Sequence, residues 1–126
     1  MPVQFKKLKG EVKTEANTFT LTEVKQAFTD KDMKLTTGEM VSQFKLENVN
    51  QAAFNSVSKD QIYIYEFPTA DERIRGSKLI EEQTQLIDIA HFPIYLEHKN
   101  ILVIFMNYLP KTNELENKIR DALKSL

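Results

Sequence analysis

The fold is decided by two stretches that read alike, KDQIYIYEFPTADERIRGSKLIEEQTQLI at residues 59–87 and KNILVIFMNYLPKTNELENKIRDALKSL at residues 99–126. Each opens with a polar turn at a lysine and continues through an apolar tract rich in β-forming residues. Each then meets a proline, Pro68 or Pro110, and ends in a pattern typical of an amphipathic helix. Recurrence after about 40 residues is the scale of one supersecondary unit. We therefore expect a ββα unit that occurs twice.

The remaining sequence predicts further helices and strands around these two units. Thr20 and Glu23 have the spacing of a capping box, in which a hydroxyl and a carboxylate satisfy the first backbone amides of a helix. Apolar Phe44 and Leu46 alternate with polar neighbours, which is typical of a strand with one face in water. The expected elements are helix 21–31, strands 40–47, 53–57 and 61–67, helix 70–86, strands 92–96 and 101–108, and a helix from about residue 113.

This order, α-β-β-β-α-β-β-α, predicts an α+β fold. We expect a two-layer sandwich with a mainly antiparallel sheet of four or five strands, and with the second and third helices packed on one face. Residues 1–18 are polar and show no sustained periodicity, so they are interpreted as a flexible N-terminal arm. Residues 19–126 are then a single domain built on the repeated ββα unit.

Composition narrows the classes of function. The chain has 126 residues, 41% of them apolar and 28% charged, as in ordinary globular domains. A net charge of −1 gives no broad attraction to nucleic acid, so nucleic acid is not expected as a partner. The absence of cysteine excludes disulfides and thiol catalysis. The longest unbroken apolar run, at residues 101–106, is too short to span a bilayer.

No pattern in the sequence indicates a catalytic residue, a metal site or a cofactor. His91 and His98 are the two histidines, and an extended strand between them would hold them about 23 Å apart. Acidic pairs at the starts of the expected helices are explained by helix capping. The three glycines stand alone, so no phosphate-binding loop can be built, and Gly76 is interpreted as close packing of a helix on the sheet. We therefore expect a protein that is not an enzyme.

The tyrosines are the candidate binding residues. Tyr63 and Tyr65 share one face of their strand, with the intervening isoleucines on the other, and Tyr95 alternates with apolar neighbours in the same way. If this sheet face is open, the three rings can bind a partner, because tyrosine combines apolar area with one polar group. If the first helix or the N-terminal arm covers the face, the same rings are half-buried core. Both interpretations stay open from sequence.

The chain resembles small uncharacterised lipoproteins of Bacillus-type Gram-positive bacteria. The segments that carry the resemblance are residues 21–28, 44–49, 62–67, 84–95 and 99–103. Such proteins have a signal peptide that ends in a lipidated cysteine, and they sit on the outer face of the membrane. This chain has neither that cysteine nor a signal core. Removal of an N-terminal targeting segment would explain both absences, and so would a cytoplasmic relative of these lipoproteins. The resemblance implies no activity for any residue.

Two hypotheses for function follow. The first is a non-catalytic extracytoplasmic binding module, tethered to the membrane through a lipid anchor outside this sequence, with a protein or a small ligand as its partner. The alternative is a cytoplasmic regulatory or assembly domain that forms a homodimer through the tyrosine face.

Overall fold

The computed structural model describes residues 18–57, 59–84, 93–106 and 114–126. Its elements are α1 (Leu21–Asp30), β1 (Leu35–Thr37), a short 3-10 helix η1 (Ser42–Phe44), β2 (Asn50–Ser56), β3 (Gln61–Glu66), α2 (Ala70–Thr84), β4 (Pro93–His98), β5 (Ile101–Met106) and α3 (Glu114–Lys124). The five strands form one antiparallel sheet in the order β1-β2-β3-β5-β4. The α+β class and the order of elements are confirmed. The expected N-terminal arm lies, apart from Thr18, outside the described residues.

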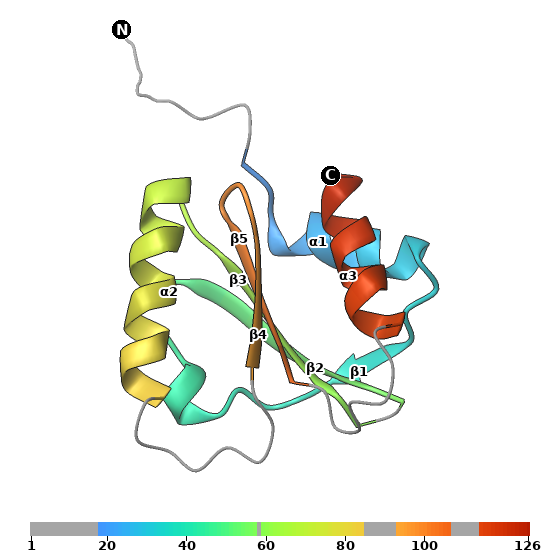
Figure 1. Ribbon diagram of the computed structural model, residues 1–126, viewed down its shortest axis with the longest axis horizontal. Coiled ribbons are helices and arrows are strands. Elements are labelled where there is room, and N and C mark those ends of the chain that lie inside the picture. The colour runs from blue at the N-terminus through green and yellow to red at the C-terminus, as the bar shows by residue number, and fades with distance from the viewer. Residues whose placement is uncertain (1–17, 58, 85–92, 107–113) are drawn as a thin grey trace, which may run out of the picture.

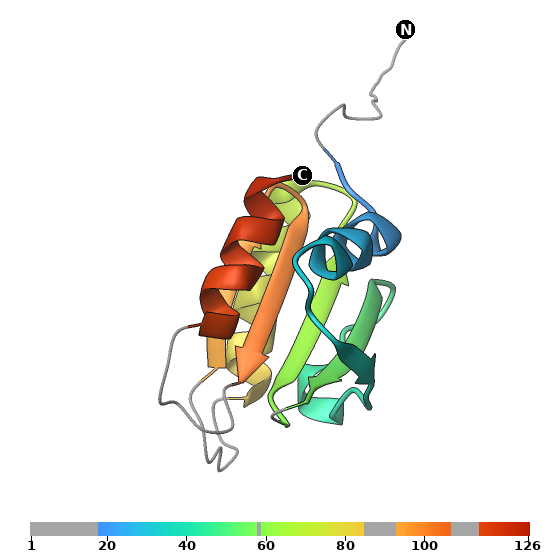
Figure 2. The same ribbon diagram turned by 90° about the vertical axis from the view of Figure 1, so that its right-hand side faces the viewer.

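The helices cover both faces of the sheet rather than one. Figure 1 shows α2 on one side of the strands and α1 with α3 on the other. In Figure 2, α1 and α3 lie together on the near face, with α2 behind the sheet. One hydrophobic cluster therefore joins α1 and α3 to the sheet, and a second joins α2 and η1 to the opposite face. The prediction that the second and third helices share a face is wrong, and the fold has three layers.

The register between β3 and β5 explains why the two helices separate. Tyr63 pairs with Ile104, so odd-numbered residues of β3 share a face with even-numbered residues of β5. Tyr63 consequently faces α2, whereas Val103, which stands 40 positions later, faces α3. Each strand packs its odd-numbered side chains against the helix that follows it. Because the antiparallel register turns these two sets in opposite directions, α2 and α3 lie on opposite faces.

The expected strand at residues 40–47 is also wrong. η1 occupies its centre, and the first strand is instead β1 at residues 35–37. Phe44 and Leu46 are buried, as their alternation predicts. Their backbone groups, however, form hydrogen bonds with side chains of β2 and β3 and not with the backbone of a neighbouring strand. Tyr65 Oη donates to Phe44 O at 2.6 Å, and the Gln51 amide bonds both the N–H and the C=O of Leu46. The segment is therefore an irregular cover over the sheet.

The two lysine turns expected from the sequence are present. Lys59 and Lys99 have φ values of 69° and 57°, in the left-handed region that a tight turn requires. After each lysine comes a buried polar residue, Asp60 or Asn100. The β4–β5 turn is closed by two residues, since His98 pairs with Ile101. Both ββα units thus start from a strained residue whose successor points inward.

Candidate functional site

The tyrosine face is covered, so of the two interpretations left open by the sequence, the open binding surface is wrong. Tyr63 and Tyr65 are 1% and 0% exposed, and Tyr95 is half-buried beside the same cluster. The cover consists of α2 and η1, not of the first helix or the N-terminal arm. The interpretation as core residues is therefore correct, with a different element as the lid. The sequence could not show this, because residues 40–47 were assigned to the sheet instead of above it.

Contacts of the three hydroxyls fit a structural role. The Tyr65 hydroxyl donates to Phe44 O, and burial, with the nearby Tyr63 and Tyr95, raises its pKa well above the usual value. Burial also raises the pKa of Tyr63, partly offset by the backbone of Val41, and its hydroxyl makes no well-formed hydrogen bond to any described residue. Burial raises the pKa of Tyr95, and a hydrogen bond with the Thr84 side chain partly offsets this. All three phenols stay neutral at physiological pH.

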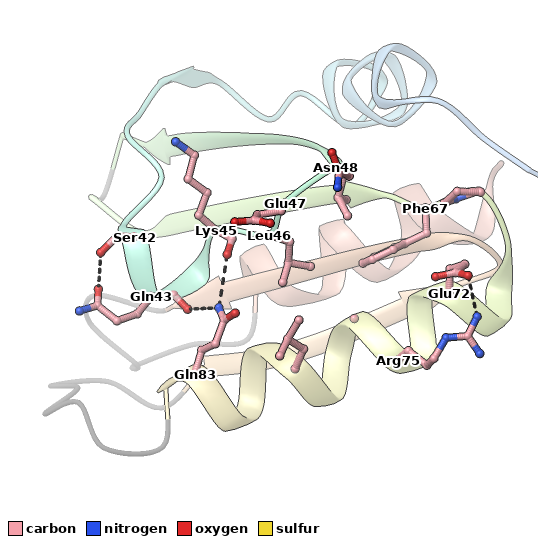
Figure 3. A pocket seen from close by; sticks show the side chains of 14 residues that line it. Ser42, Gln43, Lys45, Leu46, Glu47, Asn48, Phe67, Glu72, Arg75 and Gln83 are labelled. Atoms are coloured by element: carbon pink, nitrogen blue, oxygen red, sulfur yellow. Dashed lines mark hydrogen bonds and ion pairs between the residues drawn. The ribbon is translucent and has the colours of Figure 1, made fainter.

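A groove of about 900 Å³ lies on the outer side of this cover, between α2 and the segment at residues 42–49 (Figure 3). From α2 it takes a stripe along the helix, Glu72, Gly76, Leu79 and Gln83, which are spaced by four, three and four residues, together with the neighbouring Arg75. The residues that line the rest of the groove are Ser42, Gln43, Lys45, Leu46, Glu47, Asn48, Val49, Phe67 and Pro68.

The floor of the groove is apolar because α2 approaches the sheet at a glycine. A Cβ atom at Gly76 would overlap the ring of Phe67 and would contact Leu46. This confirms the sequence interpretation of Gly76 as a close-packing position. Beside it, the side chain of Leu79 is 46% exposed, although leucine side chains are more often buried. An exposed leucine over a glycine floor gives the groove an apolar centre.

Polar groups form both ends of the groove. At one end, Gln83 Nε2 donates to the carbonyls of Gln43 and Lys45 at 3.0 and 3.3 Å, which holds the 42–49 segment against the helix. At the other end, Arg75 and Glu72 form an exposed ion pair of 2.6 Å. Opposite charges are present in equal number around the rim, so the groove carries no strong field. It can hold an apolar side chain flanked by hydrogen-bonding groups.

Sequence reasoning missed this groove. Of its central residues, the sequence indicates a role for Gly76 alone, as a close-packing position. The juxtaposition of Gly76 and Leu79 with Leu46 depends on the 42–49 segment crossing above α2 instead of joining the sheet. The one local sign of an apolar surface here is the imperfect apolar stripe of α2. In the structure, two of its apolar side chains, Ile74 and Leu79, are 45% and 46% exposed.

The described histidine and acidic side chains form no further candidate site. His98 is half-buried and its ring stacks on Phe19, while His91 lies outside the described residues. Within residues 18–57, 59–84, 93–106 and 114–126, no three His, Asp or Glu side chains lie close enough to hold a metal ion. None of the described helices is long and apolar enough to cross a membrane.

No protein-family model, no curated protein and no solved structure matches this chain.

Proposed function

We propose that this chain is a non-catalytic binding module whose partner-binding surface is the groove between α2 and residues 42–49. The observation that supports this is the half-exposed Leu79 above the glycine floor, inside a concave surface with hydrogen-bonding groups at both ends. In the floor, Phe67 stacks on the buried Tyr65, and a floor that is already packed lowers the cost of ordering on binding.

The partner that fits best is an extended segment of another protein. The part of α2 that lines the groove runs from Glu72 to Gln83 and is about 16 Å long, a distance that about five extended residues span. Such a segment would place one apolar side chain at Leu79 and its backbone beside the amides of Gln43 and Gln83. A protein partner is thus favoured over a small ligand, because the groove is long, open and free of a strong charge.

The proposed setting is the outer face of the membrane, with an N-terminal lipid anchor. Its support is the resemblance to Gram-positive lipoproteins. Reading the gene upstream of Met1 tests it: a signal core and lipobox cysteine support the proposal, and a ribosome-binding site directly before Met1 contradicts it. A homodimer through the tyrosine face, the alternative hypothesis, is not supported, because α2 and η1 cover those rings.

Peptide selection tests the groove. A display library of random linear peptides is panned on the immobilised chain, and enriched peptides are then measured against two variants by fluorescence polarisation. Leu79→Glu places a charge in the apolar centre, whereas Val57→Glu makes the same kind of change at a residue that is 82% exposed and does not line the groove. We expect Leu79→Glu to weaken binding at least tenfold, because an unpaired carboxylate must be desolvated.

Val57→Glu should bind as the parent chain does. Thermal unfolding of both variants verifies that each is folded, which is expected since both positions are substantially exposed. Equal affinity of all three proteins for the enriched peptides would place the binding surface elsewhere. A library that yields no enriched peptide would contradict the proposed class of partner.

A further inference from the structure

The segment that leads into α1 is fastened to the end of the sheet by one buried side chain. Asn100, 2% exposed at the β4–β5 turn, accepts a hydrogen bond from Phe19 N and donates to Phe19 O and to Phe67 O. The two bonds to Phe19 imitate the pairing of an extra strand residue. Glu66 adds a third attachment by accepting from Leu21 N at 2.9 Å.

The ring of Phe19 rests on the imidazole of His98. Their centroids are 5.9 Å apart and their planes are inclined by 28°. His98 Nε2 is buried and has no hydrogen-bond partner among the described residues. A neutral imidazole tolerates this site, but a protonated one would leave a charged N–H donor without an acceptor, which is far more costly.

The charged groups around His98 also oppose its protonation. Burial lowers the pKa of His98, and the positive charges of Lys99 and Arg73 lower it further. The carboxylate of Glu97, on the same strand, is engaged by Arg73 at 3.0 Å. On β3, which is separated from β4 by β5, the carboxylate of Glu66 is engaged by the backbone at the start of α1. The carboxylates of Glu97 and Glu66 are thus both engaged by other donors.

We propose that His98 makes the attachment of Phe19 sensitive to pH: protonation of the imidazole favours release of Phe19, and of the segment that enters α1, from the β4–β5 turn. Release exposes Nε2 to water, and a water oxygen can then accept a hydrogen bond from the protonated nitrogen, which keeps its proton. Asn100 and Glu66 carry the attachment when His98 is neutral. The effect concerns the segment at Phe19 that leads into α1, and it is independent of the groove at α2.

Linkage gives the direction and size of the effect. Burial is the first cause of the lowered pKa of His98. The proposal requires that cover by the Phe19 ring supply part of this burial, so that the attachment is complete above about pH 6.5 and weakens as the pH falls toward the lowered value. Each unit of difference in pKa between the attached and released states changes the attachment equilibrium about tenfold. The free energy of unfolding falls in the same pH range, because the unfolded chain binds the proton more tightly.

The test is amide hydrogen exchange of Phe19, whose N–H donates to Asn100 Oδ1. Exchange is measured by NMR between pH 7.5 and 5.0 and corrected for its intrinsic pH dependence. In the parent chain, protection should fall about tenfold per unit of pKa difference as the pH is lowered. In His98→Phe, which keeps a stacking ring and cannot titrate, protection should not change with pH. The same loss of protection in both proteins would overturn the proposal.

A second measurement remains informative if His98→Phe is poorly folded. The His98 imidazole is titrated by NMR in the parent chain and in Phe19→Ala. By reciprocity, loss of the Phe19 ring should raise the pKa of His98 toward 6.5. A titration at 6.5 or above in the parent chain, or an unchanged value in Phe19→Ala, would contradict the proposal.

Discussion

At the scale of single residues, the two buried tyrosines of β3 differ in what their hydroxyls contact. Tyr65 Oη bonds Phe44 O at 2.6 Å, whereas the Tyr63 hydroxyl makes no well-formed bond within the described part of the chain. Tyr65→Phe should lower the free energy of unfolding by about 1–3 kcal/mol, because it leaves a buried carbonyl unsatisfied. Tyr63→Phe should change it by less than about 0.5 kcal/mol or raise it. Urea denaturation at pH 7 measures both, and equal losses would contradict this assignment.

Gly76 offers a second prediction at this scale. In a free helix position, alanine would gain about 1 kcal/mol over glycine. Here the added methyl group overlaps the ring of Phe67, which is 3% exposed and cannot move into solvent. We expect Gly76→Ala to lower the free energy of unfolding by about 1–3 kcal/mol through overpacking. Glu82→Ala, at an exposed position of the same helix, is the control and should be nearly neutral; stabilisation by Gly76→Ala would show that the floor is loose.

At the scale of elements, the sequence predicts correctly those features that depend on neighbouring residues alone. The capping box of Thr20 and Glu23 was predicted and is present, with Glu23 N donating to Thr20 Oγ1. The lysine turns were predicted because a hairpin needs a polar break between two apolar runs. The strand at residues 40–47 failed because alternation reports which side chains are buried, not which backbone groups pair. Here Gln51 and Tyr65 satisfy the backbone in place of a neighbouring strand.

The β4–β5 turn gives a prediction for an element. Lys99 has φ of 57°, a conformation that costs a residue with a Cβ atom about 1 kcal/mol and glycine very little. The added freedom of the unfolded chain offsets about 0.5–1 kcal/mol of this gain, so Lys99→Gly should raise the free energy of unfolding by no more than about 0.5 kcal/mol. Denaturation is measured at pH 8, where His98 is neutral in every variant. A loss of stability would show that the Lys99 side chain matters more than its backbone conformation.

At the scale of the whole molecule, the helix faces and the groove could not be read from sequence. The helix faces depend on the register of β3 against β5, which joins residues about 40 positions apart and has no local signature. The groove arises only because η1 lies over the tyrosines while α2 approaches at Gly76. The sequence correctly predicts that Tyr63 and Tyr65 share one face of their strand. It does not show which elements cover that face, because this depends on packing between distant segments.

Asn100 is where the layers meet, since it bonds Phe19 before α1 and Phe67 before α2. Asn100→Ala leaves three backbone groups of these segments without their partner. We expect a loss on the order of 3 kcal/mol in the free energy of unfolding, together with loss of Phe19 amide protection at every pH. Asn50→Ala, an exposed asparagine at the start of β2, is the control. A loss below about 0.5 kcal/mol would mean that water replaces all three bonds.

The central claim is that the groove between α2 and residues 42–49 binds an extended segment of a partner protein. The most direct measurement is the map of amide chemical-shift changes when the ¹⁵N-labelled chain is titrated with an enriched linear peptide. The account predicts that the largest changes fall on Leu46, Gly76, Leu79 and Gln83, in one saturable step. Changes confined to α1 and α3, or none that saturate, would contradict it.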